Sequence, residues 1–223
     1  MITRPPSSAL LVRRSVLLII VALFNVGLAR AEAVDPAIER LYSFLNGLQT
    51  VEAEFVQQVE EADGHVPEVS RGRFSAKRPG KFRWDYREPF EQMILSDGSS
   101  VYYYEIDLAQ VTKTSARLLE DTPAAFFVSD RALSKTFTLS VAEDKVWKLP
   151  SVRMLPKKEG TVTAIIITLH PQKNEILNLA VEDSLGNYSR FTFSKMHYNQ
   201  PIEAERFNFT LPDGVDLIDE PAN

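Results

Sequence analysis

Few residues of this 223-residue chain have the types and spacing of a catalytic centre. The three histidines, His65, His170 and His197, lie far apart in the sequence, without the spacing of metal ligands. The chain has no Gly-x-Ser-x-Gly motif and no glycine-rich phosphate-binding loop. Acidic residues are numerous, but no spacing singles out a pair. We therefore predict no catalytic residue, no metal and no cofactor, and keep a lipid-processing hydrolase as an alternative.

What the chain has in excess is aromatic side chains at alternate positions. Phe82, Trp84 and Tyr86 alternate with charged residues, and a period of two places the three rings on one face of a strand. The residues predicted to line one concave face are Phe55, Phe74, Phe82, Trp84, Tyr86 and Ile94, with Phe191 and Phe193 on facing strands and Phe126, Phe127 and Val128 on a helical segment. Such residues either fill a core or line an apolar cavity, and the pattern alone favours the filled core.

The elements that must position these rings are mostly strands. Turn signals recur about every ten residues, which is typical of an antiparallel sheet or barrel. An amphipathic helix is expected from Pro36, after the N-cap Asp35, to Asn46-Gly47, and a short one from Pro123, after Thr122. Strands are expected at 53–59, 72–76, 101–106, 110–114, 136–141, 146–149, 162–169, 176–181 and 188–195, two more between Gly80 and Asp97, and a helical turn at 203–207.

The first 31 residues have the pattern of a secretory signal peptide. Arg13 and Arg14 precede an apolar run at 16–24, and small-x-small sites place cleavage after Ala31 or Ala33. The apolar run is shorter than the ~20 residues of a membrane span. We expect a signal peptide at 1–31, a single domain at 32–223, and export to the periplasm.

The net charge and the lack of cysteine exclude several classes of function. Cleavage after Ala31 would remove four of the 25 basic residues and none of the 30 acidic ones, which leaves a net charge of −9. Such a chain is not drawn to nucleic acid or to an anionic membrane surface. Without cysteine it has no disulfide and no lipobox, so its own core must hold it together. The seven basic residues at 71–87 are either a solvated outer face or a docking patch for an acidic partner.

The stretch at 77–104 resembles a known family. Lys-Arg-Pro-Gly-Lys-Phe-Arg-Trp-Asp-Tyr, then Pro-Phe-Glu-Gln and Ser-Asp-Gly, is similar to the core of the LolA family of periplasmic lipoprotein carriers. The similarity extends over the chain after the signal peptide, strongest at 72–112 and weak at 136–158. It implies a mainly β (α+β) fold: a single incomplete antiparallel β-barrel of about eleven strands, with a helical lid over an apolar cavity. The cavity would then be lined by the aromatic residues named above.

The resemblance also implies roles and partners. Arg78 matches the arginine that holds the lid closed, and Phe82 matches an aromatic residue of the cavity; otherwise Arg78 is a solvated turn charge. The implied cargo is acylated lipoproteins, received from the inner-membrane ABC transporter LolCDE and passed by a monomer to the outer-membrane acceptor LolB. The alternative is a lipid- or lipoprotein-sensing regulatory domain of the same fold, as in RseB.

Overall fold

A computed structural model describes residues 35–220, except 63–67, 117–122, 130–132 and 174. The predicted signal peptide, His65 and the predicted cap Thr122 lie outside the described residues. The helices are α1 (Pro36–Gly47), α2 (Pro123–Val128) and α3 (Leu133–Thr136), with 3₁₀ turns η1 (Ile106–Leu108) and η3 (Ala204–Phe207). The strands are β1 (Thr50–Glu60), β2 (Glu68–Lys77), β3 (Lys81–Glu88), β4 (Gln92–Asp97), β5 (Ser100–Glu105), β6 (Gln110–Ser115), β7 (Phe137–Glu143), β8 (Pro150–Pro156), β9 (Val162–Leu169), β10 (Ile176–Asp183), β11 (Tyr188–Tyr198) and β12 (Asp216–Asp219).

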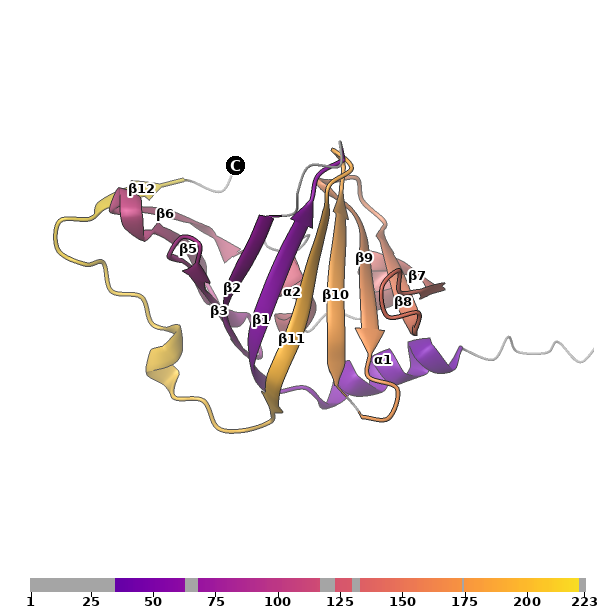
Figure 1. Ribbon diagram of the computed structural model, residues 1–223. Coiled ribbons are helices and arrows are strands. Elements are labelled where there is room, and N and C mark those ends of the chain that lie inside the picture. The colour runs from indigo at the N-terminus through magenta and orange to yellow at the C-terminus, as the bar shows by residue number, and fades with distance from the viewer. Residues whose placement is uncertain (1–34, 63–67, 117–122, 130–132, 174, 221–223) are drawn as a thin grey trace, which may run out of the picture. The chain divides into compact units, whose positions relative to one another are not determined.

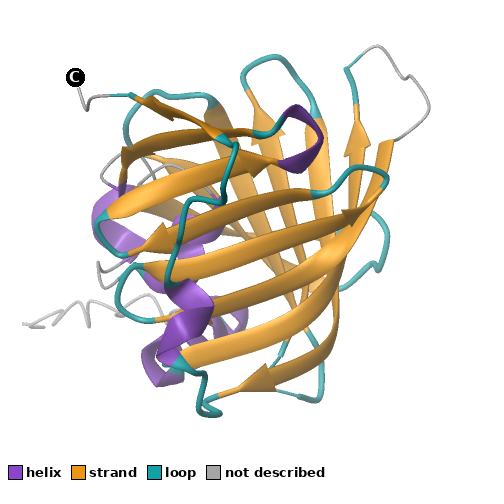
Figure 2. Ribbon diagram, turned by 90° about the vertical axis from the view of Figure 1, so that its left-hand side faces the viewer, coloured by secondary structure: helices purple, strands orange, loops and turns teal. Residues whose placement is uncertain are grey.

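The twelve strands form one open sheet in the order β12-β6-β5-β4-β3-β2-β1-β11-β10-β9-β8-β7. Neighbouring strands are antiparallel, except that β12 lies parallel to β6. Figure 2 shows that the sheet curves strongly, with helices on its concave side. The expected open, mainly antiparallel fold is confirmed. The sequence missed β12, whose four residues are too few to give a pattern.

The hairpin at Asp97-Gly98 and the helix α1 form for the expected reasons. At the turn between β4 and β5, the Asp97 carboxylate accepts hydrogen bonds from the N–H groups of Ser99 (2.7 Å) and Ser100 (2.8 Å). At the start of α1, the Asp35 carboxylate accepts from Ala37 N (2.8 Å), as an N-cap should. Helix α1 packs on β7 and β8, and α2 packs on β2 and β3 (Figure 1). The two helices therefore cover different parts of the concave face.

The prediction of a strand at 146–149 was wrong. These residues form a turn, and the strand begins at Pro150. The cause is Asp144, whose Oδ1 accepts from the backbone N–H groups of Val146 (2.9 Å) and Trp147 (2.7 Å). This side chain offers the backbone an alternative to the β-ladder, so an apolar run that looks extended curls instead.

Asp144 is also the centre of a buried polar network on the outer face of the sheet. Its Oδ2 accepts from Thr168 Oγ1 (3.1 Å) and Asn178 Nδ2 (3.0 Å), and Arg190 Nη1 lies 3.4 Å from Oδ1. Burial raises the pKa of the Asp144 carboxyl, but the N–H groups of Trp147 and Val146, the Thr168 hydroxyl and the Arg190 charge outweigh burial and hold this pKa below its usual range. The network ties the β7–β8 turn to β9, β10 and β11.

We expect Asp144→Ala to lower the free energy of unfolding by about 3 kcal/mol, because it leaves Arg190 buried without its counter-charge. Exposed Asp213→Ala is the control and should cost little. Since the folded pKa is lowered, the stabilisation is present above the unfolded pKa of about 4 and is lost as pH falls through the folded value. Urea denaturation should show the gap between the wild type and Asp144→Ala shrinking below about pH 4; a gap independent of pH would contradict this account.

Gly72 in β2 lies opposite Phe55 of β1 in the sheet register. A Cβ atom at this position would lie 2.0 Å from the carbonyl oxygen of Asp85 and 2.9 Å from Cε1 of Phe55. The missing side chain therefore makes the space in which the Phe55 ring lies, a common reason for glycine inside a strand.

Gly72→Ala should lower the free energy of unfolding by about 3 kcal/mol, because both the Asp85 backbone and the Phe55 ring must move. The control is Gly47→Ala, where a Cβ would meet nothing within 4 Å. Thermal or urea unfolding of the two variants gives the comparison, and equal effects would show that Phe55 is not seated on Gly72.

Candidate functional site

The ten apolar residues predicted for the ligand site lie together in one cluster on the concave face. Rings from different strands are in contact: Phe74 and Trp84 have centroids 4.3 Å apart, Phe55 and Trp84 4.9 Å, and Trp84 and Phe191 5.1 Å. The members are Phe55, Phe74, Phe82, Trp84, Phe126, Phe127, Phe191 and Phe193, all buried, and Tyr86 and Ile94, partly buried. Strand periodicity predicted the shared face of the eight strand residues, while Phe126 and Phe127 join the cluster from α2. The binding of lipid by these residues remains a prediction.

Helix α2 closes this aromatic cluster with its own side chains. Phe127 is fully buried, and its ring lies 4.7 Å from that of Phe74 and 5.7 Å from that of Phe193. Phe126 stacks edge-on against Phe127 at 5.2 Å. Here the rings of the protein itself pack against one another, so a ligand in the same place would have to displace α2.

Arg78 joins the β2–β3 turn to both covering helices. Its Nε donates to the carbonyl oxygen of Phe127 in α2 (2.9 Å), and its Nη1 donates to that of Leu45 in α1 (2.8 Å). Gly80 N, in the same turn, donates to the carbonyl oxygen of Val128 (3.2 Å). All three carbonyls are in the last turn of their helix, where the helix dipole favours a positive charge. Arg78 is thus more than a solvated turn charge.

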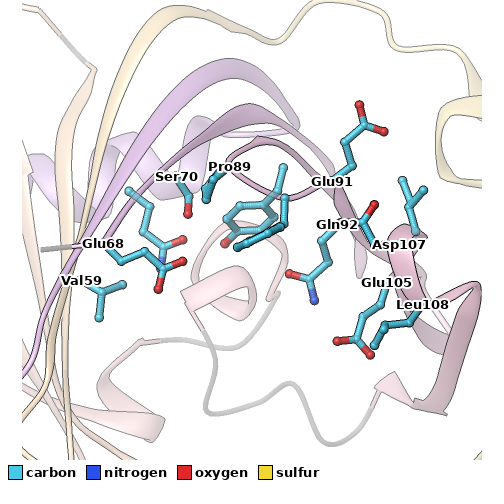
Figure 3. A pocket seen from close by; sticks show the side chains of 13 residues that line it. Val59, Glu68, Ser70, Pro89, Glu91, Gln92, Glu105, Asp107 and Leu108 are labelled. Carbon is cyan, nitrogen blue, oxygen red and sulfur yellow. The ribbon is translucent and has the colours of Figure 1, made fainter.

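A pocket of about 640 Å³ lies on the concave face beyond the aromatic cluster. Figure 3 shows the side chains that line it. Alternate residues of a strand share one face, so the residues that line the pocket lie on the same face as the cluster. Gln57 and Val59 follow Phe55 at alternate positions of β1, and Gln92 lies two residues before Ile94 in β4. Tyr86 belongs to both, since it lines the pocket and its ring lies 5.0 Å from that of Phe55. We call this the mouth pocket; its lining residues are Gln57, Val59, Glu68, Ser70, Tyr86, Pro89, Phe90, Glu91, Gln92, Glu105, Ile106, Asp107 and Leu108.

The mouth pocket combines apolar and acidic groups. Phe90 and Leu108 are 69% and 67% exposed, although both are large apolar side chains. Four carboxylates line it, and no Lys, Arg or His does so among the residues that the structure describes. Burial raises the pKa of the Tyr86 hydroxyl far above its usual range, so this group stays neutral. The sequence analysis did not predict this pocket. Two short segments in turns could have indicated it, because each places an acid beside large apolar residues: Phe90-Glu91 and Ile106-Asp107-Leu108.

The histidines that the structure describes come from separate elements, since His170 follows β9 and His197 lies in β11. No group of three or more His, Cys, Asp or Glu side chains within the described ranges is placed to hold a metal. His170 Nδ1 accepts from the N–H groups of Gln172 and Lys173, both at 3.2 Å, which is a structural role. His197 is exposed on β11. None of the helices in the described part combines the length and apolarity of a membrane span.

The basic stretch at 71–87 is interleaved with acids on the outer face. Arg71 pairs with Glu88 (3.2 Å), and Asp85 pairs with Arg83 (2.7 Å) as well as with Arg206 (2.5 Å) of the C-terminal segment. Of the seven basic residues in the stretch, Arg71 and Arg83 thus have acidic partners on the outer face.

Comparisons with known proteins agree with this arrangement. The family model described as "Outer membrane lipoprotein carrier protein LolA" matches residues 46–210. The outer-membrane lipoprotein carrier protein of Chromobacterium violaceum is 36% identical over 193 residues, which cover 86% of this chain and 91% of that protein. The one of Methylococcus capsulatus is 32% identical over 208 residues, covering 91% and 97%.

A crystal structure of an uncharacterized conserved protein from Thermus thermophilus shares the fold, with a TM-score of 0.52 and 11% identity, over 82% of this chain and 99% of that one. At 11% identity, this similarity supports the fold and nothing about function. The family model, in contrast, spans most of the described residues, and the two carriers match over nearly their whole length. The chain therefore belongs to the LolA family of outer-membrane lipoprotein carrier proteins.

Proposed function

We propose that this protein is a periplasmic chaperone that binds the acyl chains of lipoproteins released from the inner membrane and delivers them to an outer-membrane acceptor. The observation that carries the proposal is the aromatic cluster, which lies on the concave face of an open sheet beneath helices held by Arg78. Membership of the carrier family supports it. The proposed donor is the transporter LolCDE and the proposed acceptor LolB. No catalytic step is part of the proposal.

The free energies of burying acyl chains and the side chains of α2 define what such a carrier must do. Two or three acyl chains contain on the order of 40 methylenes, each worth about 0.8 kcal/mol when removed from water, so release into water would cost ~30 kcal/mol. The side chains by which α2 covers the cluster, those of Phe126, Phe127 and Val128, are worth about 1.5–3 kcal/mol each when buried. Acyl chains can therefore outcompete α2 for the concave face, and α2 can close again after the cargo leaves.

The first test is the cargo itself. The protein, purified from periplasm in the presence of its transporter, should carry lipoprotein or diacyl and triacyl fragments that native mass spectrometry detects. Gly72→Ala, which disturbs the seat of Phe55, should carry less if the variant remains folded. Wild-type protein that emerges with neither lipid nor lipoprotein, even with the transporter supplied, would contradict the proposal.

Arg78→Leu tests the lid. This substitution removes the donors to the Leu45 and Phe127 carbonyls and should alter cargo release while the protein remains folded, since charged hydrogen bonds are worth about 1.5–3 kcal/mol each. Arg78→Lys should be intermediate, because an ammonium lacks the planar fork. Arg71→Leu, on the outer face, is the control. In a reconstituted transfer assay to the acceptor, unchanged kinetics for Arg78→Leu would refute the gate role.

A further inference from the structure

The concave face changes character along its length. Around Phe74 and Phe82 the inward-facing side chains are aromatic and buried. Towards the mouth pocket the same alternation brings polar and acidic side chains inward: Glu68 and Ser70 precede Gly72 in β2, and Glu105 follows Tyr103 in β5. An apolar ligand that lies along the face would therefore have its polar end at the mouth.

The carboxylates of the mouth pocket come from several elements. Figure 3 shows Glu68 on one side of the pocket and Glu105 and Asp107, with Gln92, on the other. Glu91 lies in the β3–β4 turn. Four carboxylates line the pocket and no described Lys, Arg or His does, so the pocket attracts cations and disfavours anions.

The pocket is not merely polar. Phe90 and Leu108 project from two turns and remain exposed, and Ile106 is 38% exposed. Large apolar side chains beside carboxylates suit a ligand that carries both an apolar group and a positive charge. A lysine or arginine side chain next to an apolar residue has this character, since its aliphatic stem packs while its charged end reaches an acid.

We propose that the mouth pocket binds the segment of cargo polypeptide that adjoins the acyl chains, and that it selects segments in which lysine or arginine lies beside apolar residues. This inference rests on the proposed carrier function, because it needs the acyl chains on the aromatic cluster. When the acyl chains lie on the aromatic cluster, the polypeptide attached to them must leave the concave face. The mouth pocket adjoins the cluster at Tyr86, so it lies where the polypeptide would leave.

The test uses the mature chain and two diacylated synthetic peptides of equal length. Both contain the same apolar residues after the acylated end; one carries two lysines and the other two glutamates. We expect the basic peptide to bind about tenfold more tightly at low salt, with the difference falling severalfold at about 0.5 M salt, where charges are screened within a few ångströms. Unacylated versions of both peptides should bind far more weakly than the acylated ones.

Two variants with equal charge changes locate the effect. The pocket variant combines Glu68→Gln, Glu91→Gln, Glu105→Gln and Asp107→Asn. The control variant combines Glu143→Gln, Glu159→Gln, Glu203→Gln and Glu205→Gln, all at exposed positions that do not line the pocket. The preference for the basic peptide should disappear in the pocket variant and persist in the control.

The outcomes separate this inference from the carrier proposal. If both acylated peptides bind equally tightly, or if the pocket variant keeps the preference, the inference is wrong and the carrier proposal stands. If the unacylated basic peptide binds as tightly as the acylated one, the pocket is a separate peptide site and the assignment to cargo fails. If neither acylated peptide binds, the carrier proposal fails, and the inference fails with it.

Discussion

The two hydrogen bonds from the Arg78 guanidinium to the carbonyls of Leu45 and Phe127 link the covering helices to the sheet. Helix α2 has six residues, too few for a stable helix by itself, so its position depends on tertiary contacts. Those contacts include the packing of Phe127 on Phe74 and Phe193 and the hydrogen bonds that the β2–β3 turn makes to the last residues of α2. In the proposed mechanism, a cover held in this way would be displaced without unfolding the sheet beneath it.

The sheet itself is held by stronger means. On the outer face the Asp144 network joins the β7–β8 turn to three further strands, with one carboxylate in contact with two backbone and three side-chain donors. Loss of a buried charge partner costs about 3–5 kcal/mol, which exceeds the worth of one hydrogen bond from Arg78. Under the proposed function, this contrast would leave the strands rigid and α2 adaptable, so that the carrier could accept and release an apolar guest.

The strand alternation of Phe82, Trp84 and Tyr86 was enough to predict the aromatic cluster, because burial of one face enforces a period of two. Hydrogen bonds from Arg78 to the backbone or carboxylates of the covering segment were predicted, but the particular carbonyls of Leu45 and Phe127 could not be, since any residue supplies one. The turn at 146–149 was mistaken for a strand because a single hydrogen-bonding carboxylate, that of Asp144, overrides the local apolar pattern. The mouth pocket escaped prediction because Phe90 and Leu108 lie in turns, where neither strand nor helix periodicity applies.

The acids of the mouth pocket have a second physical consequence. Exposed Phe90 and Leu108 form a surface that would tend to associate with its own copy on another molecule. Two such mouths brought together would also bring eight carboxylates together, and like charges across an interface oppose association. The same charges that would favour a basic cargo segment would therefore oppose the association of two mouths through their exposed apolar residues. The exposed apolar side chains and the carboxylates lie in the same pocket. A partner that buries the apolar side chains therefore gains binding free energy when it also neutralises the carboxylates.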